Sequence, residues 1–341
     1  MEALHEYKSI SDYAVIGDMH SAALVGLDGS IDWCCFPRFD SPSVFAALLD
    51  SKKGGKFRLA PKEKHSTTQA YEEDTNILTT KFQTSGGSAK LTDFMPCFMQ
   101  DGKLKTFSAI VRMLEPLEGR FTFRIDYQPR LNYGIGDTLL ERTKSGGYAA
   151  RNGASLLTMN PSIRLAKAIA GSLNDEFDIV TGEKAFFVVK YGKGRGSGRI
   201  EADVLEHELA RTSAFWRSWA RRIKYEGRWR EQVVRSALVL KLLQYSPTGA
   251  LVASVTTSLP ETIGGERNWD YRYSWVRDAA FSLWALDGIG ATREAIDYAR
   301  WLVKARRHGR MPMLQIMDRI EGESDLDERT LDHLEGYRGS R

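Results

Sequence analysis

The hydrophobic pattern of this chain changes its period near residue 200. Before that point apolar side chains alternate with polar ones, as between Arg120 and Gln128, where the apolar positions are Phe121, Phe123, Ile125 and Tyr127. A period of two is typical of strands with one buried face. Glycine-containing turns, which favour hairpins, interrupt this pattern at Asp28-Gly29, Gly86-Gly87, Gly146-Gly147 and Gly192 to Gly198. We therefore expect residues 1–199 to form an antiparallel β-sandwich.

From Ile200 onward the period is that of a helix. Apolar or small residues are spaced four, three, four and three apart at Leu205, Leu209, Thr212, Trp216 and Trp219. This spacing predicts a helix with one buried stripe, which would link two domains over residues 200–227. Val233 to Leu243 is apolar on most sides, as in an inner helix, whereas Ala291 to Arg306 is amphipathic. The apolar positions of the latter include Ile296, Ala299, Trp301 and Leu302.

The fourteen residues from Gly265 to Asp278 combine charged and aromatic side chains more densely than the rest of the chain. Aromatic residues occupy the odd positions, which are Trp269, Tyr271, Tyr273 and Trp275, and polar residues occupy the even ones, which are Asp270, Arg272 and Ser274. This alternation predicts an extended segment with one aromatic face. The apolar run from Asp278 to Leu286 then predicts a buried helix with Arg277 and Asp278 in its first turn. Ser274 is a candidate N-cap.

Two interpretations of these residues are open. Asp278 is favoured by the helix macrodipole, and aromatic residues near a helix start are usually part of a core, so each residue taken alone is explained by structure. Taken together, rings beside a guanidinium and a carboxylate are suited to a sugar, because rings cover the apolar faces of a pyranose and charged groups bind its hydroxyls. The residues concerned are the four rings of the segment together with Arg277 and Asp278.

The run from Asn268 to Asp278 closely resembles the signature of glycoside hydrolase family 15, which contains glucoamylases, glucodextranases and prokaryotic trehalases. Two segments near the start are similar to the trehalase-like members: Asp12 to Trp33 and Phe36 to Phe45. Two later segments are similar to the part of the family that follows the second pair of barrel helices: Leu314 to Met317 and Leu331 to Ser340. The resemblance implies that residues 228–341 form a partial, truncated (α/α)6 barrel after the sandwich, with only the first few of its twelve helices. It also implies an exo-acting, inverting α-glucoside hydrolase that releases glucose from the non-reducing end.

On this resemblance, Arg277 and Asp278 would hold the hydroxyls of the glucose in subsite −1, and Tyr271 and Trp275 would line the same pocket. The family's general-acid and general-base glutamates lie in motifs that have no match here and are expected beyond Arg341. No catalytic residue is therefore assigned, and the chain is expected to be a fragment whose helical part is poorly stable by itself. The carboxylates present do not stand at the family's positions: Glu261, Glu266, Glu321, Glu323 and Glu335.

Two alternative functions remain open at this stage. A disaccharide phosphorylase built from a sandwich and an (α/α)6 barrel would use phosphate in place of a general base. A non-catalytic, carbohydrate-binding role would need no acid and base at all. The identity of the α-glucoside and the oligomeric state are not fixed by the sequence, which leaves a homo-oligomer open.

Composition narrows the range of partners. The formal net charge of +4 is too small to indicate a nucleic acid or a membrane surface as partner. The six histidines form no metal-binding spacing, and no phosphate- or dinucleotide-binding motif is present, so we expect neither a metal nor another cofactor. Three cysteines and no signal-like apolar segment at the start favour a cytoplasmic protein. The basic residues from Arg217 to Arg228 are interpreted as a solvated helix face in preference to an anion site.

Overall fold

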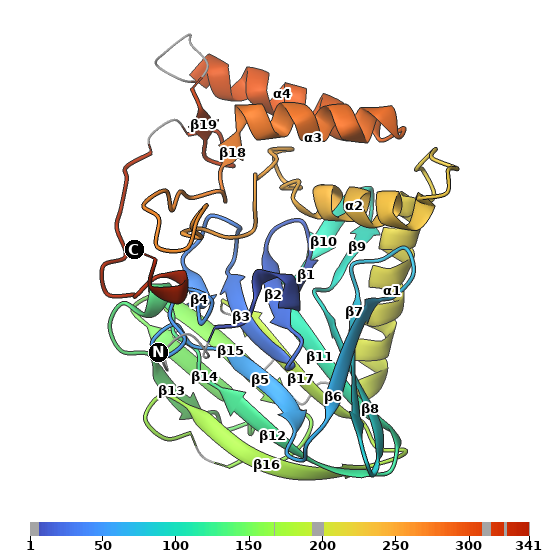
Figure 1. The fold of residues 1–341 in the computed structure, drawn as a ribbon, viewed down its shortest axis with the longest axis vertical. Coiled ribbons are helices and arrows are strands. Elements are labelled where there is room, and N and C mark those ends of the chain that lie inside the picture. The colour runs from blue at the N-terminus through green and yellow to red at the C-terminus, as the bar shows by residue number, and fades with distance from the viewer. Residues whose placement is uncertain (1–6, 167, 193–200, 309–314, 324–325, 341) are drawn as a thin grey trace.

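The computed structural model describes residues 7–166, 168–192, 201–308, 315–323 and 326–340. Two antiparallel sheets packed face to face make up its N-terminal part, and helices follow (Figure 1). This arrangement confirms the predicted antiparallel β-sandwich. Most of the predicted glycine run lies outside the described residues, because only Gly192 is among them.

The first sheet has seven strands in the order β1-β2-β3-β5-β12-β16, with β4 paired to β3. Their bounds are Tyr13–Gly17 (β1), Ala22–Gly26 (β2), Ser30–Cys35 (β3), Ser43–Phe45 (β4), Phe57–Pro61 (β5), Arg120–Tyr127 (β12) and Leu173–Val180 (β16). In β12 the side chains alternate between buried and more accessible positions, as its sequence predicts. At the β2–β3 turn Gly29 has a φ of 77°, and a Cβ there would lie 2.2 Å from the carbonyl oxygen of Leu59. Only glycine fits this turn.

The second sheet has eight strands in the order β13-β14-β15-β17-β11-β8-β7-β6. Their bounds are Ser66–Tyr71 (β6), Leu78–Thr84 (β7), Gly87–Phe94 (β8), Ala109–Glu118 (β11), Leu139–Arg142 (β13), Tyr148–Asn152 (β14), Ser155–Pro161 (β15) and Ala185–Tyr191 (β17). A separate hairpin pairs β9 (Cys97–Gln100) with β10 (Lys103–Thr106). Short 3-10 turns are described at Ile10–Asp12, Asn132–Gly134 and Tyr337–Gly339.

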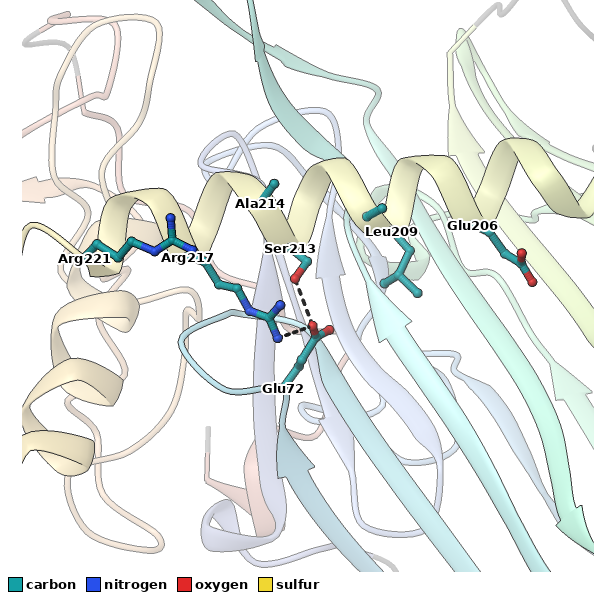
Figure 2. Close-up of a pocket in the computed structure, with 8 residues that line it drawn as sticks. Glu72, Glu206, Leu209, Ser213, Ala214, Arg217 and Arg221 are labelled. Carbon is teal, nitrogen blue, oxygen red and sulfur yellow. Dashed lines mark hydrogen bonds and ion pairs between the residues drawn. The ribbon is translucent and has the colours of Figure 1, made fainter.

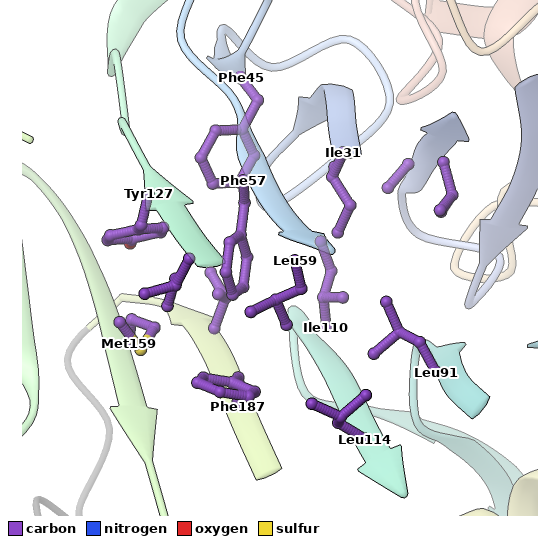
Figure 3. Close-up of a cluster of buried hydrophobic side chains, with 14 of the residues drawn as sticks. Ile31, Phe45, Phe57, Leu59, Leu91, Ile110, Leu114, Tyr127, Met159 and Phe187 are labelled. Atoms are coloured by element: carbon purple, nitrogen blue, oxygen red, sulfur yellow. The ribbon is translucent and has the colours of Figure 1, made fainter. Parts of the chain in front are cut away.

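The core of the sandwich lies between the two sheets and is apolar, with aromatic rings packed edge to face (Figure 3). One charged pair is buried inside it. The Arg112 guanidinium binds both carboxylate oxygens of Asp93 at 2.8 and 3.1 Å and donates to the carbonyl oxygens of Phe57 and Gly29 at 2.7 Å each. Because all these partners are present, the desolvation of the two charges is compensated. The pair joins three strands, β5, β8 and β11, to the β2–β3 turn.

Helix α1 (Ala202–Ala220) connects the sandwich to the remaining helices. Leu205 packs with Val111 and Val188 on the outer face of the second sheet, whereas Trp216 and Trp219 join a second apolar cluster with α2 (Arg230–Leu242). The predicted stripe is therefore confirmed. From Val233 to Leu243, only Ser236 is exposed, which agrees with a helix that is apolar on most sides.

Helices α3 (Val276–Gly288) and α4 (Thr292–His308) lie side by side at the far end of the molecule (Figure 1). The prediction that α3 is buried is wrong, because Phe281 is 68% exposed and Trp284 is 78% exposed. In α4 the side chains of Ile296 and Ala299 are exposed, contrary to expectation. Trp301 is buried and Leu302 partly buried, as the pattern predicts, and the described buried positions of α4 also include Glu294, Tyr298 and Ala305.

Candidate sugar-binding site

The segment before α3 is not continuously extended, contrary to the prediction. A turn covers Tyr271 and Arg272, and the regular strand is limited to β18 (Ser274–Trp275), which pairs with β19 (Met317–Asp318). The polar and aromatic residues of this segment still alternate, but between buried and partly exposed positions. Arg272 is 3% exposed and Ser274 is fully buried, whereas the rings on either side are partly exposed. The polar residues therefore face the protein and the rings face outward.

Two of the predicted substrate-binding residues form a stacked pair. The rings of Tyr271 and Trp275 lie 5.1 Å apart, centroid to centroid, with 28° between their planes. The indole Nε1 of Trp275 donates to the backbone oxygen of Asp270 at 3.0 Å, which fixes the orientation of the indole. This pair presents flat apolar surface of the kind that packs on the face of a sugar ring.

The other two candidates follow directly in the first turn of α3. Arg277 binds Asp278 through Nη2 and Oδ2 at 3.1 Å, and its guanidinium carbon lies 5.9 Å from the centroid of the Trp275 ring. In the described part of the chain, the side-chain hydrogen bonds of Arg277 all go to Asp278. The N-cap is Trp275 and no side-chain capping bond forms, so the predicted role of Ser274 as a cap is wrong. Ser274 instead faces Tyr298.

The four candidates thus form one contiguous cluster. The Arg277 side chain is 68% exposed and that of Asp278 is 31% exposed, which leaves both able to form new hydrogen bonds. Of the neighbouring rings, Trp269 is 44% exposed, and Tyr273 lies under the guanidinium of Arg319, 5.7 Å from its centroid.

Sequence reasoning missed the residues that hold this cluster in place. The guanidinium of Arg272 binds Asp270 and reaches the loops of the sandwich at Ser41 and Tyr133. Burial alone would lower the pKa of Arg272, but the carboxylate of Asp270 holds that pKa well above its ordinary value. Burial also raises the pKa of the Cys35 thiol to about 11, so this thiol is neutral. In the sequence, Arg272 is a charged residue between two aromatic ones, a pattern that predicts a side chain exposed to solvent.

The carboxylates noted in the sequence are engaged elsewhere or face solvent. Glu261 lies 3.7 Å from Arg267 in an exposed ion pair, and Glu321 accepts from the hydroxyl of Tyr245 at 3.1 Å. Glu335 accepts from the hydroxyl of Tyr7, and burial together with this carboxylate raises the pKa of that tyrosine. None of these contacts gathers two carboxyl groups at the cluster. Two further acids are exposed: Glu266 and Glu323.

The expected position of the general acid and base, beyond Arg341, is not tested by this structure. Arg341 itself lies outside the described residues, of which Ser340 is the last. The placement of the two glutamates beyond Arg341 therefore stays a prediction, and no described carboxylate is assigned to either role.

A cavity of about 500 Å³ lies along α1, away from the cluster (Figure 2). Its lining includes Arg217 and Arg221 from the basic helix end. Glu72 accepts a hydrogen bond from Ser213 at 2.9 Å and pairs with Arg217 at 2.7 Å, so one of these cations is already neutralised. Among the described residues, no group of three histidine, cysteine or acidic side chains is placed to hold a metal ion. The described helices also include none with the length and apolar character needed to cross a membrane.

Comparison with known proteins gives matches to two family models. A family model described as "Trehalase-like, N-terminal" matches residues 5–173, and one described as "Glycosyl hydrolases family 15" matches residues 227–341. Residues 227–341 are thus a glycosyl hydrolase family 15 segment, and a trehalase-like N-terminal part precedes it. The family matches agree with the resemblance of the segment that ends at Asp278.

Curated relatives share sequence with this chain, and a solved structure shares its fold. The trehalases of Thermoplasma volcanium and Thermoplasma acidophilum are 35% and 37% identical to this chain, over 98% and 93% of its length. A trehalase of Mycolicibacterium smegmatis is 34% identical over 98%. The chain spans about half of each relative, 53%, 54% and 53%. A bacterial glucoamylase crystallised with acarbose has a TM-score of 0.67 at 13% identity, covering 93% of this chain and 53% of that one. This likeness confirms a sandwich followed by part of a helical barrel.

Proposed function

We propose that this protein acts on α-glucosides as an exo-acting, inverting hydrolase, and that Tyr271, Trp275, Arg277 and Asp278 bind the non-reducing glucosyl unit. The observation that carries the proposal is the stacked Tyr271–Trp275 pair next to an exposed arginine–aspartate pair at the start of α3. The relatives named trehalase support the substrate class. Trehalose is therefore the first sugar to test, before maltose and maltotriose.

The chemistry of the cluster fits a glucosyl unit. The rings offer apolar surface for the C–H groups of the sugar, while the carboxylate of Asp278 accepts from hydroxyl groups and the guanidinium of Arg277 donates to them. A charged hydrogen bond contributes about 1.5–3 kcal/mol. Inversion further needs two carboxyl groups about 6.5–9.5 Å apart, one to protonate the leaving oxygen and one to activate water. In this proposal residues 228–341 carry the sugar-binding cluster, residues 1–199 frame it through the 200–227 connection, and the acid–base pair lies beyond Arg341.

The test is calorimetric titration of the chain with trehalose, maltose and maltotriose. We expect Asp278→Asn to weaken binding about 10- to 100-fold, because it removes at least one charged hydrogen bond. Asp287→Asn is the matched control, since Asp287 is an exposed aspartate at the other end of the same helix. We expect this control to bind as the wild type does.

Two results would count against the proposal. One is the same affinity in Asp278→Asn as in the wild type. The other is no heat of binding with any of the three sugars at millimolar concentrations. Turnover that depended on added phosphate would instead move the protein to the phosphorylase class.

A further inference from the structure

Arg272 is a buried arginine whose partners are distributed over several loops. Its Nε and Nη2 bind the two carboxylate oxygens of Asp270 at 2.9 and 2.6 Å. Its Nη1 donates to the carbonyl oxygen of Ser41 at 2.7 Å, and its Nη2 donates to the hydroxyl of Tyr133 at 2.7 Å. Ser41 lies between β3 and β4, and Tyr133 lies in the 3-10 turn at 132–134. One side chain therefore joins the turn before α3 to two loops of the sandwich.

The same contacts reach the stacked ring pair through Asp270. One carboxylate oxygen of Asp270 accepts from the backbone N–H of Arg272 at 3.0 Å, and the backbone oxygen of Asp270 accepts from the Trp275 indole at 3.0 Å. Asp270 is thus held at its side chain by Arg272 and in turn holds Trp275. Trp275 stacks on Tyr271 and lies beside Arg277.

Packing alone does not require an arginine at this position. Taking a guanidinium out of water is costly, and an apolar side chain of similar volume would anchor the turn without that cost. What the arginine adds is direction, because its planar set of donors fits its partners in one orientation only. The rings of Trp33 and Tyr133, 5.9 and 5.5 Å from the guanidinium carbon, also lie beside it.

We infer that Arg272 is a positioning residue, through which the loops of the β-sandwich set the orientation of Trp275 and hence of the sugar-binding cluster. This inference rests on the proposed function for the choice of ligand, but its structural part is independent of any ligand. It gives the sandwich a role in shaping the sugar site from a distance.

The chain offers a matched control in Arg112. Both arginines are buried, both bind an aspartate through two oxygens and both donate to backbone carbonyl groups, but Arg112 lies in the sandwich core. Arg272→Met and Arg112→Met therefore remove similar interactions at two different places. The readouts are the dissociation constant for trehalose and the hydrogen-exchange rate of the Trp275 indole N–H, assigned by its loss in Trp275→Phe.

We expect Arg272→Met to weaken trehalose binding tenfold or more and to speed exchange of the Trp275 indole N–H by at least tenfold. Arg112→Met should change both by less than twofold. Arg272→Lys should restore only part of the effect, because an ammonium group cannot make the two-oxygen contact with Asp270 and also reach both loops. Should Arg272→Met not fold, Tyr133→Phe removes a single partner and should raise the indole exchange rate severalfold.

The inference is overturned if Arg272→Met, or Tyr133→Phe in its place, leaves the indole exchange rate of Trp275 unchanged. It is also overturned if Arg112→Met changes that rate as much as Arg272→Met does. If the wild-type chain binds none of the sugars, the proposed function fails while the exchange measurement still decides the positioning role.

Discussion

At the scale of single residues, Asp18 is the buried acid whose charge state is most altered by the fold. Its side chain is fully buried in the turn between β1 and β2. The end of α2 packs closely on the preceding residue, since a Cβ on Gly17 would lie 2.8 Å from Leu242. Burial raises the pKa of Asp18 to about 7 from an ordinary 3.8, although backbone N–H groups of Ser21 and His20 act in the opposite direction. The other carboxylate oxygen, Oδ2, has no hydrogen-bond partner in the described structure.

This carboxyl group should make folding stability depend on pH. Between about pH 4 and 7 the unfolded chain loses the Asp18 proton while the folded chain retains it, so stability falls as pH rises, by about 4 kcal/mol in total. Above pH 7 the loss is complete. We expect Asp18→Asn to remove this part of the pH dependence, as measured by urea unfolding at a series of pH values from 4 to 8. Asp101→Asn, at an exposed hairpin position, is the control, and an unchanged slope in Asp18→Asn would disprove the assignment.

Residue chemistry in the candidate site was only partly predictable. The four sugar-binding candidates were identified from the resemblance of this segment to the family signature, and the structure brings all four into one cluster. The roles of Arg272 and Ser274 were not predictable, because a charged or polar residue between rings is expected to face water. The burial of Arg272 depends on Ser41 and Tyr133, which lie far away in the chain.

At the scale of elements, the side chains that α3 and α4 bury differ from those predicted. The neighbouring elements of a helix, and not its own composition, decide which of its side chains are buried. The rotation of α4 is set by a charged residue. Glu294 accepts from the indole of Trp219 at 2.8 Å and pairs with Lys241 at 2.8 Å, so this acid faces inward and Ile296 faces outward. A hydrophobic pattern predicts that charged residues face solvent, so it does not predict a helix orientation in which Glu294 is buried.

A pair of substitutions in α3 tests the element's orientation. Leu286 is fully buried, so Leu286→Ala should cost about 2–5 kcal/mol of unfolding free energy. Trp284 is 78% exposed, so Trp284→Ala should change stability by no more than about 0.5 kcal/mol despite its larger side chain. Urea unfolding of both variants measures the two changes. Equal losses would mean that Trp284 is covered in solution.

At the scale of the whole molecule, the two parts of the chain differ in how completely they are enclosed. Every residue of β3 is buried, since the sandwich core covers one face and the segments around Val255 and Leu334 cover the other. In α3 the buried residues are Ala279 and Leu286. The change of period near residue 200 predicts that helices follow a sandwich. It does not predict which outer faces of the sandwich the later segments cover.

This difference predicts unequal protection from hydrogen exchange. Amide groups of α3 should exchange about tenfold or more faster than those of β3, because opening a helix with few buried contacts disturbs little else. Hydrogen exchange followed by mass spectrometry measures both in one experiment. Equal protection of the two elements would show that they open as one cooperative unit.

The segment from Leu331 to Ser340 packs on the earliest part of the described chain. The rings of Tyr7 and Tyr337 lie 5.7 Å apart, and the hydroxyl of Tyr337 donates to the backbone oxygen of Lys8 at 2.9 Å. Contacts over such a long sequence separation close a large loop and therefore form late in folding. During synthesis on the ribosome, the part of the outer face of β3 that this segment covers therefore stays open to solvent until residue 337 has left the exit tunnel.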